Sequence, residues 1–135
     1  MAENTFKLQI ISPDRIFFDG EVEMVEMRTT EGDIGILKDH IPLTAVIVPG
    51  VLTLHVEGGT REAAVHDGFV EILKDKVIVL AEASEWPEEI DINRAKEAKI
   101  RAERRLSGAE GEVNVERAEG ALRKALIRID IAERH

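Results

Sequence analysis

The sequence predicts an α+β protein. An N-terminal antiparallel β-sandwich, residues 1–86, is followed by a C-terminal antiparallel two-helix hairpin, residues 87–135. Two observations predict this division. Between residues 6 and 83, short runs rich in Val and Ile alternate with turn signals, which is typical of sandwiches and barrels. At Trp86-Pro87 the composition then changes to Ala, Glu, Lys and Arg, which are strong helix formers.

The clearest strand pair lies near the middle of the sandwich region. Leu52, Leu54 and Val56 alternate with polar residues, and Gly58-Gly59 offers a hairpin turn before a second run at residues 63–65. Further runs at 43–48, 69–73 and 77–81 are separated by Pro49-Gly50, Asp67-Gly68 and Lys74-Asp75. We therefore expect connected antiparallel strands. In residues 22–27 the apolar positions break strict alternation, which predicts a β-bulge there.

Two helices are predicted after the boundary. Asp91 is a suitable N-cap for a helix that runs to Leu106 and ends at Ser107-Gly108. A second helix fits residues 113–132, and Gly108 and Gly111 bracket a short connection that favours an antiparallel hairpin. The predicted apolar stripes are Ile92, Ala95, Ala98 or Lys99, Ala102 and Leu106 on the first helix, and Ala118, Ala121, Leu122, Ala125, Leu126 and Ile129 on the second.

Alanine dominates these stripes, and this composition predicts weak docking. Each buried methylene contributes about 0.8 kcal/mol, so a face of alanines buries little. Gly120 lowers helix stability further, by roughly 1 kcal/mol relative to Ala. A helix pair with strong intrinsic propensity and weak packing is suited to two arrangements of similar free energy, as in a conformational switch.

Composition and charge exclude several functions. The chain has 135 residues, 44% of them apolar, with 4% aromatic residues and no cysteine, so disulfides, thiolate metal sites and Cys nucleophiles are absent. No window approaches the ~18 apolar residues of a membrane span, and we expect a soluble cytoplasmic protein. The net charge is −9, with 16 acids and 7 bases in residues 1–86 and 11 of each in residues 87–135. The acidic first part should be repelled by nucleic acid.

Motifs for catalysis are missing. The segment from Gly32 to Lys38 has the wrong spacing for a phosphate-binding loop and lacks a hydroxyl after the lysine. The four histidines are scattered, so we predict no metal site. Asp39-His40 has no serine in a nucleophile-elbow context, which leaves an enzyme at this loop without a nucleophile.

Two other features leave alternatives open. The irregular stretch from Glu31 to Leu43 is either a plain surface turn or a contact loop. The hairpin carries Arg94, Arg101, Arg105, Arg123, Lys124 and Arg128. Ion pairs such as Glu97 with Arg101 would explain most of these cations as a solvated face, whereas converging arginines would form an anion site.

Several motifs together resemble the epsilon chain of rotary ATP synthases, and the resemblance covers essentially the whole chain. They are residues 31–37 (Glu-Gly-Asp-Ile-Gly-Ile-Leu), residues 40–43 (His-Ile-Pro-Leu), residues 68–71 (Gly-Phe-Val-Glu) and residues 81–83 (Ala-Glu-Ala). Residues 90–95, Ile-Asp-Ile-Asn-Arg-Ala, resemble the Ile/Leu-Asp-x-x-Arg-Ala motif of bacterial epsilon subunits that bind ATP.

This resemblance implies a ten-stranded sandwich that binds the central gamma stalk and rests on the membrane ring of c subunits. Glu31, Asp33 and His40 would then face the c ring. It also implies a hairpin with two states. Folded down, the hairpin permits ATP hydrolysis; extended along gamma, it reaches the alpha and beta subunits and inhibits. The absence of a transit peptide favours the cytoplasmic face of a bacterial plasma membrane.

In ATP-binding relatives the nucleotide stabilises the folded hairpin, as a regulator and not a substrate. The resemblance assigns this role to Glu85, Ile90, Asp91, Arg94, Ala95, Arg101, Lys124 and Arg128. Lys124 departs from the two arginines expected on the second helix, and lysine keeps the charge but loses the bidentate fork. The rival interpretation is a free-standing ATP-sensing module that does not bind gamma.

Overall fold

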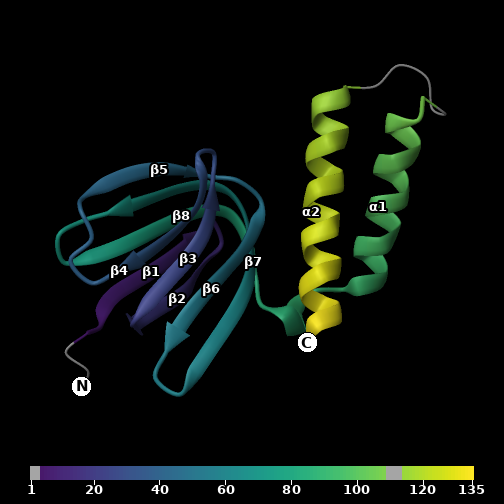
Figure 1. The fold of residues 1–135 in the computed structure, drawn as a ribbon. Coiled ribbons are helices and arrows are strands. Elements are labelled where there is room, and N and C mark those ends of the chain that lie inside the picture. The colour runs from purple at the N-terminus through teal and green to yellow at the C-terminus, as the bar shows by residue number, and fades with distance from the viewer. Residues whose placement is uncertain (1–3, 109–113) are drawn as a thin grey trace. The chain divides into compact units, whose positions relative to one another are not determined.

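The chain divides into two units, residues 1–85 and residues 86–135, and each is described by itself (Figure 1). The computed structural model describes residues 4–108 and 114–135. The predicted Gly111 of the helix connection and the predicted helix start at residue 113 lie outside these ranges. Within them, strands occupy the first unit and helices the second, so the predicted α+β class is confirmed.

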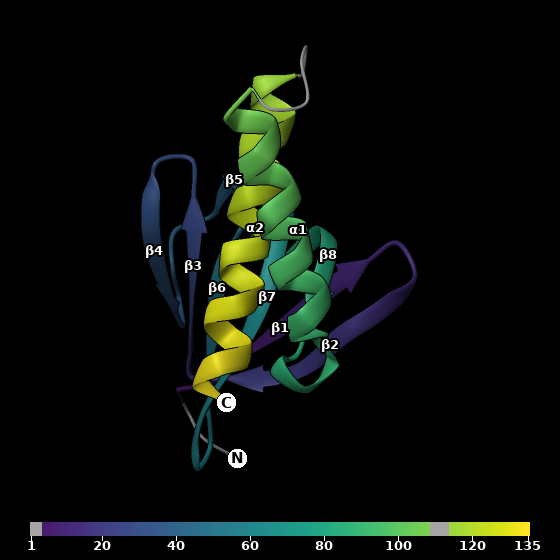
Figure 2. The same cartoon turned by 90° about the vertical axis from the view of Figure 1, so that its right-hand side faces the viewer.

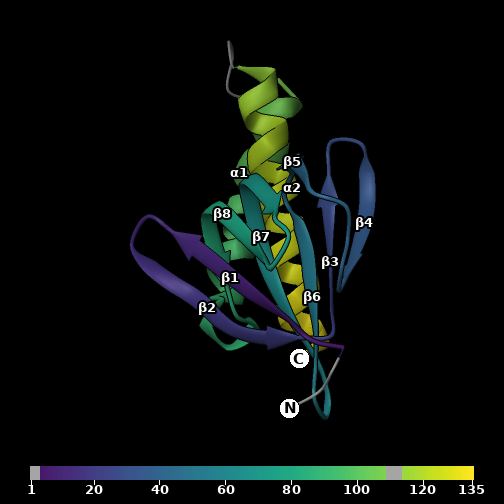
Figure 3. The same cartoon turned by 90° about the vertical axis from the view of Figure 1, so that its left-hand side faces the viewer.

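The first unit contains eight strands in the described residues. Their bounds are β1 Phe6–Ser12, β2 Arg15–Val22, β3 Met24–Thr29, β4 Gly32–Leu37, β5 Leu43–Ile47, β6 Gly50–Val56, β7 Gly59–Ile72 and β8 Lys76–Glu85. The strand order is β2-β1-β8-β7-β5-β3-β4, and β6 bridges β3 and β7. The strands wrap around a shared core, as Figures 2 and 3 show from two sides.

One strand pair is parallel, which the prediction of an antiparallel sandwich did not include. β1 pairs with β8 in parallel register from Lys7 opposite Lys76 to Ile11 opposite Leu80. All other pairs of strands are antiparallel. The first and last strands of the sandwich are therefore neighbours.

The two predicted runs at 63–65 and 69–73 are wrong as separate strands, because both belong to β7. This strand pairs with β6 through Val65 and with β5 from Gly68 onward. Asp67 has a positive φ of 43°, and at Gly68 a Cβ would lie 1.9 Å from the Leu80 carbonyl oxygen. The Asp67-Gly68 signal therefore marks a bend within a continuous strand. The described residues contain eight strands, against the ten that the resemblance implied.

The bulge predicted in residues 22–27 is wrong as well. Val22 ends β2 and Met24 begins β3, so the apolar positions of residues 22–27 belong to two different strands. Each strand has its own alternation of inward and outward side chains, and the alternation need not continue from one to the other. The register of β3 with β4 is unbroken. The register shift of this region lies instead between β1 and β2, where Phe17 is the extra residue between Ile16 and Phe18.

An aliphatic core fills the sandwich. Alternating residues of β1, β3, β6 and β8 point inward, so that Leu8, Val25, Leu54 and Val79 are completely buried. The aromatic residues contribute little, since Phe6 and Phe17 are the buried ones in the described sandwich. This agrees with the low aromatic content of the sequence.

The second unit is a helical hairpin. A 3₁₀ turn η1, Pro87–Glu89, leads into α1, Ile92–Leu106, and α2 spans Val115–Arg134. Ala95 and Ala102 of α1 and Ala118 and Ala125 of α2 are buried, as the alanine stripes predict. Leu106 and Leu126 were expected on these stripes but are exposed, and Ile131, which was not expected there, is buried. Of the helices in the described residues, neither is apolar enough along its length to span a bilayer.

Candidate functional site

The segment before α1 is an N-terminal capping structure. Glu89 accepts a hydrogen bond from the backbone amide of Trp86 at 2.9 Å, which closes η1. Asp91 has an extended backbone, and its Oδ1 accepts from the Arg94 amide at 3.1 Å. The predicted N-cap is therefore confirmed. This contact between the Asp91 side chain and the Arg94 amide orders the motif of residues 90–95, and it needs no ligand.

The cations of the hairpin are divided between its two faces. Successive helical residues turn by about 100°, so Arg94 and Arg101 lie to one side of the buried Ala95 and Ala102, and Lys96 lies to the other. Lys96 contacts Glu133 of α2 at 3.9 Å. This ion pair shows that the side of α1 with Lys96 and the side of α2 with Glu133 belong to the same face of the hairpin.

The face opposite this ion pair is basic. On α2, Glu133 lies about 80° to one side of Ala125, whereas Lys124 and Arg128 lie about 100° and 60° to the other. The side chains of Arg94 and Arg101 therefore share a face of the hairpin with those of Lys124 and Arg128. We name this the basic face, and its members are Arg94, Arg101, Arg105, Arg117, Lys124 and Arg128.

The same contact fixes how the two helices align. Arg101 lies five residues after Lys96, and Arg128 lies five residues before Glu133 in the antiparallel helix. The helix rises about 1.5 Å per residue, so Arg101 and Arg128 lie the same distance from the ion pair. The two residues are therefore level, that is, at the same height along the hairpin axis. Arg105 and Lys124 are level one turn further along. Two pairs of cations thus face the same direction, about one helical turn apart.

Acidic side chains of the described helical residues lie elsewhere around the helices. By the same rotation they point toward the Lys96–Glu133 side or away from the seam between the helices. These acids are Glu97, Glu103, Glu116, Glu119, Asp130 and Glu133. An example is Asp130, which pairs with Arg134 at 3.3 Å on the outer side of α2. The basic face therefore gathers six cationic side chains on one side of the hairpin, in a protein that is acidic overall.

A cleft of about 360 Å³ opens at the base of the hairpin. Its lining combines Pro87, Glu88 and Ile90 of the turn with Ile92 of α1 and two residues at the end of α2, Ala132 and His135. Ile90 thus offers an apolar surface next to the cap. The lining thus combines aliphatic side chains with the polar groups of Glu88 and His135.

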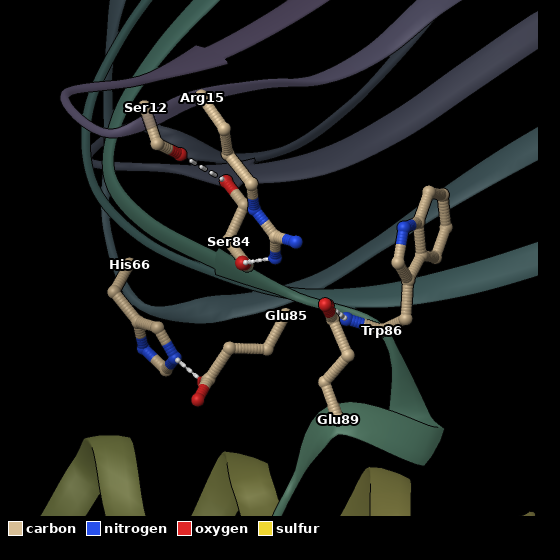
Figure 4. A network of polar contacts seen from close by, with 7 residues as sticks. All are labelled: Ser12, Arg15, His66, Ser84, Glu85, Trp86 and Glu89. Atoms are coloured by element: carbon tan, nitrogen blue, oxygen red, sulfur yellow. Dashed lines mark hydrogen bonds and ion pairs between the residues drawn. The ribbon is translucent and has the colours of Figure 1, made fainter.

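Glu85 lies at the end of β8, where the sandwich unit finishes (Figure 4). Its Oε1 lies 3.1 Å from Nε2 of His66 on β7. The His66 side chain is 1% exposed, whereas that of Glu85 is 26% exposed. Sequence reasoning missed His66, because the contact follows from the register of β7 on β8, which no local pattern reveals.

Two further contacts hold the end of β8. The Arg15 guanidinium donates to the Ser84 carbonyl oxygen at 3.0 Å. The buried hydroxyls of Ser12 and Ser84 lie 3.3 Å apart, as Figure 4 shows. The loop between β1 and β2 is thereby fastened to the residue just before Glu85.

The residues predicted to face the c ring, Glu31, Asp33 and His40, do not form one cluster. Glu31 and Asp33 lie at the tip of the β3–β4 hairpin, where Asp33 accepts from Arg28 at 3.0 Å. His40 follows the other end of β4, beyond a strand of about 20 Å. Its Nδ1 lies 2.8 Å from the Ile41 carbonyl oxygen, and its amide donates to Leu37. Asp39 and His40 thus form a turn after β4 that is held by backbone hydrogen bonds.

A cleft of about 440 Å³ lies beside His40. It is bounded by the end of β4, the β7–β8 turn and the start of β1, with Lys38, Asp39, Lys74 and Asp75 among its lining residues. Charges of both signs alternate along its rim. In the described residues no group of three metal-ligating side chains comes together.

An apolar row crosses the outer face of the sandwich, and the sequence did not single it out. Val46, Phe69 and Leu80 are direct cross-strand neighbours on β5, β7 and β8, and the row continues to Ile11 and Ile16. The exposed fractions are 50% for Val46, 49% for Phe69 and 64% for Ile16. These side chains could be found only from the strand register, since in the sequence they resemble core residues.

Family models for the ATP synthase delta/epsilon chain match both units. The model of the β-sandwich domain matches residues 5–87, and the model of the long α-helix domain matches residues 88–133. The ATP synthase epsilon chain of Caldanaerobacter subterraneus subsp. tengcongensis is 46% identical over 98% of this chain and 97% of that relative. The chain belongs to the ATP synthase epsilon family. It is accordingly a subunit of the ATP synthase and not one of its catalytic chains.

Another member of the epsilon family also matches over nearly its whole length. The epsilon chain of Halalkalibacterium halodurans is 44% identical over 96% of this chain and 98% of its own. The fold is also that of a chain in the Euglena gracilis mitochondrial ATP synthase structure of OSCP, F1 and c-ring. This likeness has a TM-score of 0.76 at 22% identity, covering 97% of this chain and 82% of that chain.

Proposed function

We propose that this epsilon subunit is a rotor component of the bacterial ATP synthase, at the cytoplasmic face of the plasma membrane. In this role the sandwich couples the gamma subunit to the c ring. The hairpin inhibits ATP hydrolysis when extended and is held folded by ATP. The observation that carries the regulatory part is the basic face, on which Arg101 and Arg128 lie at the same height along the hairpin.

The apolar row supports the attachment to gamma. Exposed aliphatic and aromatic side chains in one row gain free energy when a partner covers them, at roughly 25 cal/mol per Å². Phe69 lies at the centre of the row, between Val46 and Leu80. A large apolar side chain at the centre of a patch is the usual anchor of an interface.

The c ring would meet the sandwich through its polar loops. Asp33 and Glu31 are exposed at the tip of the β3–β4 hairpin, and His40 is half-buried beyond the far end of β4. Because β4 separates them, we assign the acidic pair and His40 to two different contacts. Asp33 is the acid that we favour for this contact, and Arg28 holds its carboxylate at 3.0 Å.

ATP would bind the hairpin with its phosphates on the basic face. Arg101 and Arg128 supply a level pair of guanidinium groups, which match phosphate oxygens in geometry. Lys124 supplies a point charge one turn further on, with Arg94 near the motif. At the other end of the nucleotide, Ile90 and Ala95 would contact the adenine ring, and Asp91 would accept from its amino group. Glu85 would lie nearby.

Regulation follows from weak packing between the helices. The buried seam of Ala95, Ala102, Ala118 and Ala125 offers few methylenes, so a ligand that prefers the folded hairpin can shift the population. In the extended state the same cations would instead meet acidic segments of the beta subunits. ATP is therefore a regulatory ligand in this proposal, with no metal required from the protein.

The proposal is tested by ATP hydrolysis of a matching alpha, beta and gamma complex, with and without this protein. We expect saturable binding and inhibition that high ATP relieves. Arg128→Glu should weaken both the inhibition and its relief. Arg123→Ala is the matched control, because Arg123 lies about 140° from Ala118 on the side opposite the basic face.

Other outcomes would change the assignment. Inhibition that ATP does not relieve would retain the rotor role and reject the nucleotide site. ATP binding by the isolated chain with no binding to gamma would favour a free-standing ATP-sensing module.

A further inference from the structure

The cleft beside His40 gathers the lysines of the sandwich. Four lysines line it, and they are all the lysines of residues 1–86: Lys7, Lys38, Lys74 and Lys76. They come from three separate segments, the start of β1, the end of β4 and the turn from β7 into β8. Residues 1–86 hold 16 acids against 7 bases, so four of the seven bases of an acidic region meet around one opening.

Two of these lysines lie side by side on neighbouring strands. Lys7 of β1 is directly opposite Lys76 of β8 in the parallel register, and like charges in such positions are destabilising. Lys7 has an exposed ion pair with Asp19 at 3.5 Å, a kind of contact that contributes little to stability. The side chains of Lys74 and Lys76 form no ion pair with any described residue. An anion held between these lysines would offset their repulsion.

Aliphatic side chains stand beside the lysines. Leu37 and Leu73 line the cleft with exposed fractions of 57% and 41%, and Ile41, in the loop after β4, is 78% exposed. The buried Ile36 and Ile72 also contribute to the lining. Binding to a membrane surface draws on both kinds of group, because apolar area enters the head-group region while cations are attracted to anionic lipids. The cleft offers the two together.

Acidic side chains of the same cleft narrow the class of anion. Glu21, Asp39 and Asp75 line it, and the Glu21 carboxylate accepts from Thr5 Oγ1 at 3.2 Å. A free phosphate ion would be repelled by these carboxylates. A phosphate diester with neighbouring hydroxyl groups would instead supply donors for them, since an ionised carboxylate only accepts hydrogen bonds. The mixed lining therefore favours a head group that carries both a phosphate and hydroxyls.

We propose that this cleft binds the head group of an anionic glycerophospholipid. The lysine ammonium groups contact the phosphate diester, and the head-group hydroxyls donate to Asp39 and Asp75. Leu37 and Leu73 contact the first methylenes of the acyl chains. Charges more than about 10 Å away are largely screened at roughly 0.1 M salt, so the acidic remainder of the chain does not prevent this contact. The site uses residues of the sandwich unit alone and is independent of the nucleotide site.

The test is sedimentation of the full chain with vesicles of equal parts phosphatidylglycerol and phosphatidylcholine, and with vesicles of phosphatidylcholine alone. We expect binding to the first kind only. Lys74→Gln should lower the partition coefficient about fivefold, and the double variant with Lys76→Gln about twentyfold to thirtyfold, as expected for lysines at an anionic surface. Arg61→Gln is the matched control, because it removes one charge from the same unit outside the cleft. Equal losses for Lys74→Gln and Arg61→Gln would mean unspecific attraction and would overturn the proposal.

A second variant separates a lipid from a free phosphate compound. Leu73→Ser keeps every charge and alters a side chain that is already partly exposed, so the sandwich should remain folded. It should lower the partition coefficient about fourfold or more, the effect of one buried methylene. Glycerol 3-phosphate, which has no acyl chains, should not displace the chain from the vesicles. Displacement by this compound, with Leu73→Ser unchanged, would make the ligand a free phosphate compound and reject the lipid.

A protein partner is the other class of ligand that the experiment can reveal. If the unaltered chain binds no anionic vesicles, the proposal fails. Weaker binding of the c ring by the double variant would in that case assign the cleft to a protein contact. Such a failure would leave the attachment to gamma and the regulation by ATP unaffected, because neither uses these lysines.

Discussion

At the scale of single residues, Gly68 is the glycine of the described sandwich at which an added side chain would meet the closest contact. A Cβ at this position would lie 1.9 Å from the Leu80 carbonyl oxygen, and the φ of 152° disfavours side chains. Gly68→Ala should therefore lower the free energy of unfolding by about 3 kcal/mol or more. Urea denaturation would measure this loss.

Gly58→Ala is the matched control for this variant. Gly58 also has a positive φ, 91°, but nothing lies within 4 Å of its Cβ position. Its replacement should cost only the backbone strain of about 1–2 kcal/mol. Equal losses in the two variants would mean that the close approach of β7 to β8 does not matter.

Asp91 has two roles that substitution can separate. Asp91→Ala removes the acceptor for the Arg94 amide and should lower helix stability by about 1 kcal/mol, seen as reduced helical circular dichroism on mild heating. Asp91→Asn keeps the cap oxygen and should preserve stability. Asn114→Ala, which removes the corresponding cap of α2, is the comparison for a pure capping loss. If Asp91→Asn still weakened ATP binding, the carboxylate charge would be identified as the ligand-binding property.

The sequence predicted the residue-scale features that are local. The Asp91 cap follows from its position before a run of helix formers, and its contact spans three residues. The pair of His66 and Glu85 spans 19 residues and depends on strand register. Glu85 was assigned by resemblance, but its partner had no signal in the sequence.

At the scale of elements, α2 contains a position where the helix is weaker than it needs to be. Gly120 has nothing within 4 Å of the place where a Cβ would be. Gly120→Ala should stabilise α2 by roughly 1 kcal/mol, measured as a higher midpoint of helix unfolding. A lower midpoint would show that Gly120 is required for packing that the space around it does not reveal.

Lys124 is the member of the basic face that falls short of the expected pattern. Lys124→Arg would supply a planar fork level with Arg105 and should tighten ATP binding about threefold to tenfold. Calorimetry at fixed salt would measure the change. Arg123→Lys, on another side of α2, should have no effect on affinity, and an equal gain there would indicate unspecific attraction.

Element boundaries were predictable where composition changes and were not where a strand bends. The change at Trp86-Pro87 lies within a residue or two of the division between the units. The Asp67-Gly68 signal was interpreted as a chain reversal, since a turn and a bend use the same residues. Leu106 and Leu126 fit the helical period but are exposed, at 36% and 45%.

At the scale of the whole molecule, the apolar row should determine whether the subunit joins the complex. Phe69→Glu replaces a half-exposed side chain, so the isolated sandwich should remain folded. Burial of a carboxylate in an interface is costly, and binding to an alpha, beta and gamma complex should weaken at least tenfold. Sedimentation or surface-based binding would measure this. Ile100→Glu, equally exposed on α1, should bind normally if the row is the attachment site.

The parallel pairing of β1 with β8 also bears on how the chain folds. Residues 7–11 must wait for residues 76–80 before the sandwich can close, so its formation depends on contacts that are distant in the sequence. During synthesis β1 and β2 can pair early, but their open edge stays uncovered until β8 leaves the ribosome. The helical hairpin, built from neighbouring segments, can form quickly afterwards. Closure of the sandwich should therefore be slower than formation of the hairpin.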